Sequence, residues 1–425
     1  MQITLADFIR NTTQGAEAEA ILRRCVHCGF CTATCPTYQL LGDELDGPRG
    51  RIYLIKQMLE GAQPTRSTQL HLDRCLTCLN CETSCPSGVQ YGRLVDIGRE
   101  VAATLVRRTP GTRLWRAFVR ELCDGPWFTP ALSIARTLRP LLPKPWQQKI
   151  PLRRAAGAWP TRRHDRRMLL LAGCVQPSMA PNINSATARV FDTLGIELVV
   201  PPDSGCCGGL RRHTDDPAGA LAQARRNVDA WWPHLEAGAE AILMNASGCG
   251  AIVREYGHLL RNDPVYATKA ARVSALTRDL AEVLPALLAP RLPLAAAGSA
   301  GRVAFHPPCS LQHAQRIRGV VEALLSACGA EVVPFKDAHL CCGSAGTYSL
   351  LQPELAGQLR DLKLAALLEP RPDTILSANV GCITHLSGKS PIRVQHWIEW
   401  VDAHFATIPA LGSADLPTGR MIEPR

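Results

Sequence analysis

The sequence predicts an α+β multidomain protein, with a helical N-terminal region followed by two tandem α/β repeats. Two observations support this fold class. A tight run of cysteines occurs twice within the first ninety residues, and a wider cysteine pattern occurs twice between residues 167 and 405. The chain has 425 residues and 46% apolar content, which is enough for several independent cores. Its 18 cysteines are therefore more consistent with metal thiolates than with disulfide crosslinks.

The N-terminal cysteine run is CxxCxxCxxxCP at residues 25–36, and residues 75–86 repeat it without deviation. Three thiolates spaced by two residues can bind three irons of one cubane, while the fourth cysteine ligates the other cluster in two-cluster ferredoxins. We therefore expect two [4Fe-4S] clusters in a helical ferredoxin-type domain. Their expected ligand sets are Cys25, Cys28, Cys31 and Cys85 for one cluster, and Cys75, Cys78, Cys81 and Cys35 for the other.

Structural zinc is the alternative for these cysteines. Zinc needs only four thiolates from two separated CxxC pairs, whereas each run here places three cysteines within seven residues and adds a fourth before proline. Soft thiolate sets of this kind favour iron-sulfur clusters. Zinc predicts a colourless protein that takes up no electrons.

The internal repeat is visible in the cysteine spacing. Cys174 and Cys206 are 32 positions apart, as are Cys309 and Cys341, and each second cysteine begins a Cys-Cys-Gly sequence. Strand and helix patterns repeat with the cysteines, which indicates a parallel sheet in each copy. The expected strands are 168–171, 197–200 and 241–243 in the first copy, and 303–305, 331–333 and 374–376 in the second. The expected helices are 186–194 and 320–327, each closed by glycine, and two more that begin at Pro217 and Pro353.

Each repeat contains four cysteines at or just after a predicted strand end. Functional sites in parallel sheets gather at the carboxyl ends of strands, so we expect the four thiols of each copy to converge. A further metal cluster and an activated thiol pair are the two options for this chemistry, and buried structural thiols are the alternative. The candidate cofactor-binding residues are Cys174, Cys206, Cys207 and Cys249, and Cys309, Cys341, Cys342 and Cys382.

The pattern divides the chain into five expected regions. They are the ferredoxin-type domain at 1–100, a connector at 101–166, the first repeat at 167–295, the second repeat at 296–405 and a tail at 406–425. The first fifteen residues lack the features of a secretory signal, and no apolar run reaches the length of a membrane span. We therefore expect a cytoplasmic protein without a transmembrane helix.

The net charge of +10 is scattered, with one denser group at residues 162–167. A solvated linker explains this group, and attraction to an anionic membrane surface or an acidic partner is the alternative. No nucleic-acid-binding module accompanies the charge, so we expect no nucleic acid partner. The sequence contains no GxGxxG fingerprint, so no dinucleotide site and no catalytic residues are expected on this chain.

At this level of detail the sequence resembles the glycolate oxidase iron-sulfur subunit family, and more broadly the heterodisulfide reductase-like proteins with Cys-Cys-Gly (CCG) repeats. The resemblance spans nearly the whole chain and is strongest at 25–38, 42–51 and 340–348. It implies a non-flavin subunit of a 2-hydroxy-acid oxidoreductase, a glycolate dehydrogenase that oxidises glycolate to glyoxylate. It also implies partner flavin-containing subunits that bind FAD, with electrons passed toward quinone at the cytoplasmic side of the inner membrane.

One departure from the wider group limits what the resemblance implies. Each repeat of the heterodisulfide reductase relatives ends in CxxC, but Ile252 and His385 occupy the final positions here. Five-cysteine noncubane clusters are therefore in doubt, while four-thiolate sites stay open. An electron-transfer subunit of a D-lactate or anaerobic glycerol-3-phosphate dehydrogenase, and a thiol redox protein resembling heterodisulfide reductase, remain as alternatives.

Overall fold

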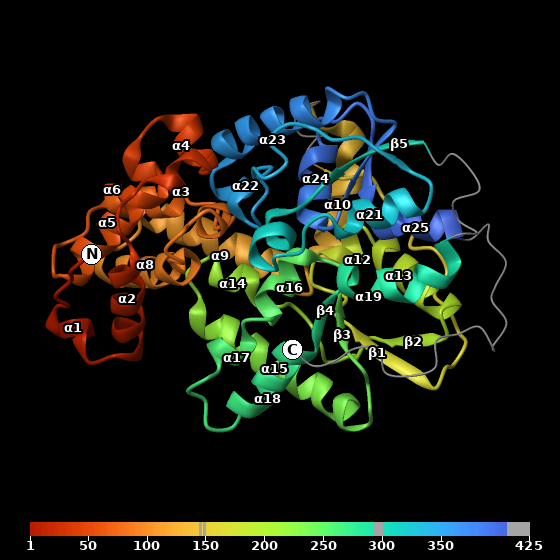
Figure 1. Ribbon diagram of the computed structural model, residues 1–425, viewed down its shortest axis with the longest axis horizontal. Helices are drawn as coiled ribbons and strands as arrows, with labels where there is room; N and C mark the ends of the chain where they lie inside the picture. The colour runs from red at the N-terminus through yellow and green to blue at the C-terminus, as the bar shows by residue number, and fades with distance from the viewer. Residues whose placement is uncertain (144–146, 148–149, 293–300, 406–425) are drawn as a thin grey trace. The chain divides into compact units, whose positions relative to one another are not determined.

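The computed structural model describes residues 1–143, 147, 150–292 and 301–405, and the expected tail at 406–425 lies outside them (Figure 1). The chain divides into two compact units. Unit 1 comprises Met1–Phe118 and His339–Lys363, and unit 2 comprises Val119–Ala338 and the chain from Leu364 onward. The Cys-Cys-Gly loop of the second repeat therefore belongs to the same unit as the N-terminal cysteine runs.

Unit 1 is helical. Helix α5 (Pro48–Leu59) begins with proline at its first turn and buries Ile52, Ile55 and Leu59 along one face, as the spacing of three and four residues predicts. A Cβ added at Gly98 of α8 would lie 2.5 Å from Ile55, so α5 and α8 pack closely. The other helices are α1 (Asp7–Arg10), α2 (Thr13–Arg24), α3 (Phe30–Ala33), α4 (Pro36–Leu41), η1 (Glu44–Asp46), α6 (Arg66–Asp73), α7 (Asn80–Thr83), α8 (Tyr91–Leu105) and α22 (Tyr348–Leu351).

Unit 2 contains two four-stranded parallel sheets of the same topology. The strand orders are β2-β1-β3-β4 and β6-β5-β7-β8, and Figure 1 labels the four strands of the first sheet. The first sheet consists of β1 (Arg166–Leu170), β2 (Ile196–Val199), β3 (Ile242–Met244) and β4 (Thr277–Asp279). The second consists of β5 (Arg302–His306), β6 (Glu331–Val332), β7 (Thr374–Ser377) and β8 (Arg393–His396).

The helices of unit 2 connect these strands and cover the sheets. They are α10 (Phe128–Leu138), η2 (Arg139–Leu141), α12 (Gln176–Met179), α13 (Asn182–Thr193), α14 (Gly209–Arg212), α15 (Pro217–Glu236), α16 (Ser247–Val253), α17 (Tyr256–Leu259), α18 (Ala267–Leu276), α19 (Leu280–Leu288), η3 (Ala289–Arg291), η4 (Ser310–Ala314), α21 (Val320–Ala327), α24 (Val380–Ser387) and α25 (Trp397–Phe405). Two more helices, α9 (Pro110–Asp124) and α23 (Pro353–Leu368), continue from unit 1 into unit 2.

The predicted fold class is confirmed: a helical N-terminal region precedes two α/β repeats. Each predicted strand is present within one or two residues, and α21 has the predicted bounds. Gly195 and Gly329 follow α13 and α21 with φ of 72° and 89°, the left-handed conformation that ends helices. The sequence-based prediction missed the fourth strand of each sheet, β4 and β8.

The two repeats are joined within unit 2. Arg189 of α13 forms a bidentate ion pair with Asp402 of α25, with Nε 3.1 Å from both carboxylate oxygens. Ser247, which begins α16 in the first repeat, donates its backbone N–H to the carbonyl oxygen of Ala378, which follows β7. The carboxyl ends of β3 and β7 therefore meet.

Within the described residues, no helix combines the length and apolar character needed to cross a bilayer.

Candidate metal centres

The first cysteine run folds around a pocket in unit 1. Cys25, Cys28, Cys31 and Cys85 line it together with Cys81. The chain turns between the cysteines because His27 and Gly29 adopt positive φ values of 57° and 85°. This turn directs the three closely spaced thiols toward one point.

The second run repeats this turn with different residues. Thr77 and Leu79 take φ values of 53° and 61°, although side chains other than glycine disfavour this region. Packing holds Leu79 there, because a Cβ added at Gly92 of α8 would lie 2.7 Å from its Cδ2. The turn borders a second pocket, which is lined by Cys35, Cys75, Cys78 and Cys81.

Burial distinguishes the thiols of the two pockets. Cys28 is exposed, and burial raises the pKa of Cys31 to about 11. Burial opposes ionisation of Cys75 as well, but the guanidinium groups of Arg51 and Arg99 and hydrogen bonds from Tyr91 and Thr77 lower its pKa below the ordinary value. The second pocket therefore contains a buried sulfur whose surroundings favour the thiolate.

The residues around both pockets fit iron-sulfur clusters. All 18 cysteines are free thiols, and the pocket linings contain eight of them, with no carboxylate that would favour a harder metal. Bound clusters would supply one-electron chemistry, while the chain would supply thiolates, hydrogen bonds to sulfur and exclusion of water.

In the first repeat the four candidate thiols converge within unit 2. Cys174 follows β1, Cys206 and Cys207 follow β2, and Cys249 lies in α16 after β3. The thiols form a hydrogen-bonded series from Cys174 through Cys206 and Cys207 to Cys249. Hydrogen bonds from Cys174 and Cys207 lower the pKa of Cys206 and raise those of the two donors, so the surroundings of Cys206 favour its thiolate form.

Buried polar groups hold this loop. Asn227 of α15 accepts a hydrogen bond from the Gly205 N–H at 2.8 Å and donates to the Cys206 carbonyl oxygen at 2.8 Å. Tyr256 donates to the Cys207 carbonyl oxygen at 2.9 Å. The side chain of Asp124, in α9, also faces Cys206. Arg211 donates a hydrogen bond to Oδ2 of Asp124 at 2.8 Å. The backbone of the Cys-Cys pair is therefore fixed from two helices, α15 and α17.

The second repeat distributes its cysteines between the units. Cys309 directly precedes η4 after β5, and Cys382 lies in α24, where it accepts a 3.6 Å hydrogen bond from Asn379. Cys341 and Cys342 are buried in unit 1, where the Gly343 N–H donates to the Cys341 sulfur at 3.4 Å. Convergence of these four thiols stays a prediction.

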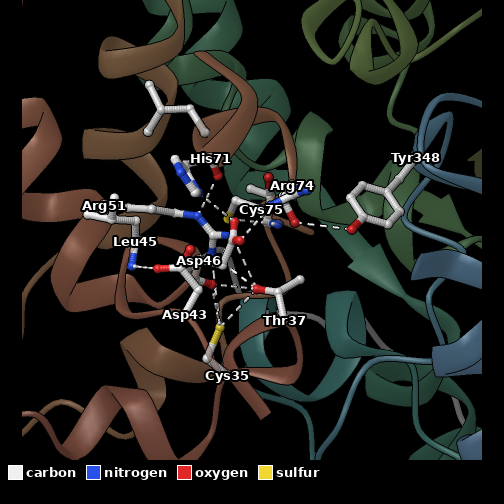
Figure 2. Close-up of polar contacts among 12 residues, drawn as sticks. Cys35, Thr37, Asp43, Leu45, Asp46, Arg51, His71, Arg74, Cys75 and Tyr348 are labelled. Carbon is white, nitrogen blue, oxygen red and sulfur yellow. Dashed lines mark hydrogen bonds and ion pairs between the residues drawn. The ribbon is translucent and has the colours of Figure 1, made fainter. Parts of the chain in front are cut away.

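Sequence reasoning missed the polar residues around the thiols. Arg51, Asp46 and Thr37 form a buried network beside Cys35 (Figure 2), and Asp124 approaches Cys206 from outside the repeat. Arg51 and Asp46 lie within residues 42–51, which carried the family resemblance, but no pattern in that stretch indicates burial of both charges. Asp124 lies outside the stretches that carried the family resemblance, and no sequence pattern singles it out.

Comparisons with known proteins agree with this arrangement. The 4Fe-4S dicluster domain family matches residues 21–89, and the cysteine-rich domain family matches residues 168–254 and 303–387. The chain is 53% identical over 404 residues to the glycolate oxidase iron-sulfur subunit of Escherichia coli (strain K12), covering 95% of this chain and 98% of that protein.

More distant relatives include the probable glycolate oxidase iron-sulfur subunit of Bacillus subtilis (strain 168), 30% identical over 89% of this chain and 91% of that protein. Lactate utilization protein A of Geobacillus thermodenitrificans (strain NG80-2) is 29% identical over 54% of this chain and 96% of its own length. With cysteine-lined pockets in unit 1, a thiol series in the first repeat and 53% identity over nearly the full length, this chain belongs to the family of glycolate oxidase iron-sulfur subunits.

Proposed function

We propose that this chain is the electron-transfer subunit of a glycolate oxidase complex. It relays electrons from FAD on a partner flavoprotein subunit toward quinone, and the oxidation of glycolate to glyoxylate takes place on the partner. The identity of 53% over 95% of the chain favours glycolate, because the lactate utilization relative is less similar and matches about half of the chain.

The grouping of thiols around the two pockets of unit 1 carries this proposal. One [4Fe-4S] cluster is bound by Cys25, Cys28, Cys31 and Cys85, and the other by Cys35, Cys75, Cys78 and Cys81. The two linings support the assignment because each contains the three closely spaced cysteines of one run and the fourth cysteine of the other. This crossed arrangement is the one that two-cluster ferredoxins use.

The repeats add further redox sites to the proposal. The first site uses Cys174, Cys206, Cys207 and Cys249, and the hydrogen-bonded thiol series supports it. The second uses Cys309, Cys341, Cys342 and Cys382 by analogy with the first. Four thiolates suffice for a cluster without the missing fifth cysteine.

The proposal also assigns the chain to the cytoplasmic side of the inner membrane, as a peripheral protein. Residues 125–164 contain eight basic residues and no acidic one. In this stretch Trp127, Ile134, Leu138 and Leu141 are 72%, 61%, 46% and 82% exposed. Their spacing of seven, four and three residues places them on one side of α10 and its continuation, and such a combination favours an anionic lipid surface.

Anaerobic iron and acid-labile sulfide analysis, with EPR of the dithionite-reduced protein, tests the cluster assignment. Two clusters give about eight irons per chain. Iron above that value, lost in Cys206→Ser but not in the matched Cys123→Ser, supports a cluster in the first repeat. About eight irons in all three proteins would restrict clusters to unit 1, and a colourless, iron-free chain would refute the proposal.

A further inference from the structure

A buried ionic network lies beside the second pocket of unit 1 (Figure 2). The side chains of Arg51 and Asp46 are 1% and 0% exposed, which is rare for charged residues unless they are paired. Arg51 donates from Nε to the His71 carbonyl oxygen at 2.7 Å and from Nη2 to Asp46 Oδ1 at 3.3 Å. Arg74 donates from Nη1 to Asp46 Oδ2 at 2.8 Å. Two guanidinium groups thus surround one carboxylate, and the three charges sum to one positive charge.

The guanidinium of Arg51 faces the sulfur atoms of the second pocket. Nη1 and Nη2 both donate to Thr37 Oγ1 at 3.2 Å, and Thr37 Oγ1 lies 3.3 Å from Cys35 Sγ. Arg51 Nη1 itself lies 4.0 Å from the same sulfur. The backbone carbonyl oxygen of Asp46 is also close to this sulfur, 3.7 Å from Cys35 Sγ, and it accepts a hydrogen bond from Thr37 Oγ1 at 2.7 Å. Both carboxylate oxygens of Asp46 pair with guanidinium groups, so Arg51 is the cation of the network that reaches the Cys35 sulfur.

The first pocket has a different electrostatic environment. Its lining arginine, Arg49, belongs to the same helix as Arg51 but is 39% exposed and pairs with Glu44. The amino group of Met1 donates to the Cys25 carbonyl oxygen at 2.7 Å in a half-buried position. Water screens charges in such positions more strongly than it screens a fully buried arginine.

Arg51 keeps its proton, because the thiolates of Cys75 and Cys35 and the carboxylate of Asp46 raise its pKa despite burial.

We propose that Arg51, held in position by Asp46, raises the reduction potential of the cluster bound by Cys35, Cys75, Cys78 and Cys81. The inference rests on the proposed function, since it requires a cluster at these thiols. Reduction adds one electron, and so one negative charge, to a buried site. A fixed cation at about 4 Å stabilises that charge far more in the protein interior than in water, and hydrogen bonds to ligand sulfur act in the same direction. Arg51 is thus a positioning residue that sets the electrostatics of the cluster and offsets the cost of its burial.

Redox titration of the full-length protein under argon, followed by EPR, measures this effect. In Arg51→Gln we expect one of the two cluster signals of unit 1 to titrate at a lower potential, while the other signal of unit 1 is unchanged. Arg51→Lys keeps the charge without the planar fork, so it should restore part of the shift. Arg49→Gln is the matched control on the same helix and should leave the second-pocket signal in place.

Iron content separates the failure of this inference from the failure of the proposed function. A wild-type protein without clusters refutes the proposed function. Full iron content with an unshifted titration in Arg51→Gln overturns the role of Arg51 alone. If Arg51→Gln loses iron, Thr37→Val decides the question, because it keeps the guanidinium and the shape of the site but removes the shared acceptor beside Cys35. A lower midpoint in Thr37→Val then supports the inference, and a wild-type midpoint overturns it.

Discussion

Single buried residues hold the thiol loops in place, and Asn227 shows how much one side chain can contribute. It is 0% exposed, and its amide group pairs with Gly205, the Cys206 carbonyl oxygen and the Tyr256 hydroxyl at 2.8, 2.8 and 3.0 Å. No water can replace these contacts without entering the core. Loss of the amide therefore leaves several buried polar groups without partners, each costing about 1–3 kcal/mol.

We expect Asn227→Leu to lower the free energy of unfolding of the first repeat by about 3 kcal/mol. Tyr256→Phe removes only the hydroxyl contact with the Cys207 carbonyl oxygen and the one with Asn227, and should cost about 1 kcal/mol. Urea unfolding followed by tryptophan fluorescence measures both, because Trp231 stacks on Tyr256. Equal stability of Asn227→Leu and wild type would contradict the role given to the amide.

The cysteines and their polar neighbours differ in how far sequence predicts them. Fixed spacing predicts Cys25 and its counterparts as ligands because three thiols must reach one cluster. Arg51 and Asn227 are set by tertiary contacts with His71 and Tyr256, twenty and twenty-nine residues away. No local pattern encodes such pairings. Sequence alone therefore predicts the thiols but not the polar side chains that lie beside the sulfur atoms and hold the thiol loops in place.

Helix α5 shows how closely two elements can approach. A Cβ added at Gly50 would lie 2.1 Å from the Glu44 carbonyl oxygen and 2.9 Å from Leu45 Cα, both backbone atoms of η1. Alanine favours helices by about 1 kcal/mol over glycine, but this overlap must displace η1, which precedes the helix that carries Arg51.

We expect Gly50→Ala to destabilise unit 1 by about 3 kcal/mol and to reduce its iron content. The matched variant is Gly357→Ala in α23, where the nearest atom to a new Cβ is the end of Arg360 at 3.9 Å. It should be neutral or stabilising by about 0.5 kcal/mol. Thermal unfolding by circular dichroism separates the two, and a stable Gly50→Ala protein would show that η1 moves freely.

An exposed apolar stripe runs along α10 and is formed by Trp127, Ile134, Leu138 and Leu141. No residue of α10 or η2 is buried. We expect the Ile134→Ser/Leu138→Ser/Leu141→Ser variant to lose at least tenfold in binding to anionic phosphatidylglycerol vesicles. Each buried large apolar side chain contributes about 1.5–3 kcal/mol, so tenfold is a lower limit.

Vesicle flotation measures this binding, with Val265→Ser as the control, because Val265 is 66% exposed on a different loop. Wild-type protein should bind neutral phosphatidylcholine more weakly, since the acid-free stretch supplies electrostatic attraction. If the triple variant floats like wild type but no longer copurifies with a flavoprotein, the stripe is a subunit interface and the membrane assignment is wrong.

Strand prediction succeeded where burial and apolar character coincide. β1 and β5 contain buried runs such as Met168–Leu170, which the sequence displays directly. β4 consists of Thr277, Arg278 and Asp279, all buried, so a polar sequence forms a buried strand at the edge of the sheet. Asp279 caps α19 and Arg278 donates to the Ala275 carbonyl oxygen at 2.7 Å. These contacts satisfy the polar groups, and no periodicity indicates them.

At the scale of the whole chain, two buried groups of unit 2 give stability opposite dependences on pH. Burial raises the pKa of Asp279 from 3.8 to about 7, so the folded state keeps a proton that the unfolded state releases. Its contribution therefore declines as pH rises from 4 to 7. Burial lowers the pKa of His396 from 6.5 to about 3, so the unfolded state gains a proton first and stability declines as pH falls below 6.5.

We expect the two effects to oppose each other in wild type between pH 4 and 6.5. In Asp279→Asn only the His396 dependence remains. Its free energy of unfolding should therefore rise relative to wild type by about 1.4 kcal/mol for each unit by which the pH increases. His396→Asn should show the reverse slope, falling relative to wild type as pH rises. Urea midpoints at half-unit pH intervals measure the slopes, and parallel curves for all three proteins would refute both assignments.

The placement of His339–Lys363 in unit 1 has a consequence for the order in which the protein matures. Tyr348 donates to the Arg74 carbonyl oxygen at 3.1 Å, and Asn80 donates to the His339 carbonyl oxygen at 3.2 Å. Tyr348 emerges from the ribosome 274 residues after Arg74, which corresponds to roughly 14 to 55 s of synthesis at bacterial rates. Throughout that interval the N-terminal part of unit 1 lacks these two hydrogen bonds, so unit 1 is completed only after Val119–Ala338 of unit 2 has been synthesised.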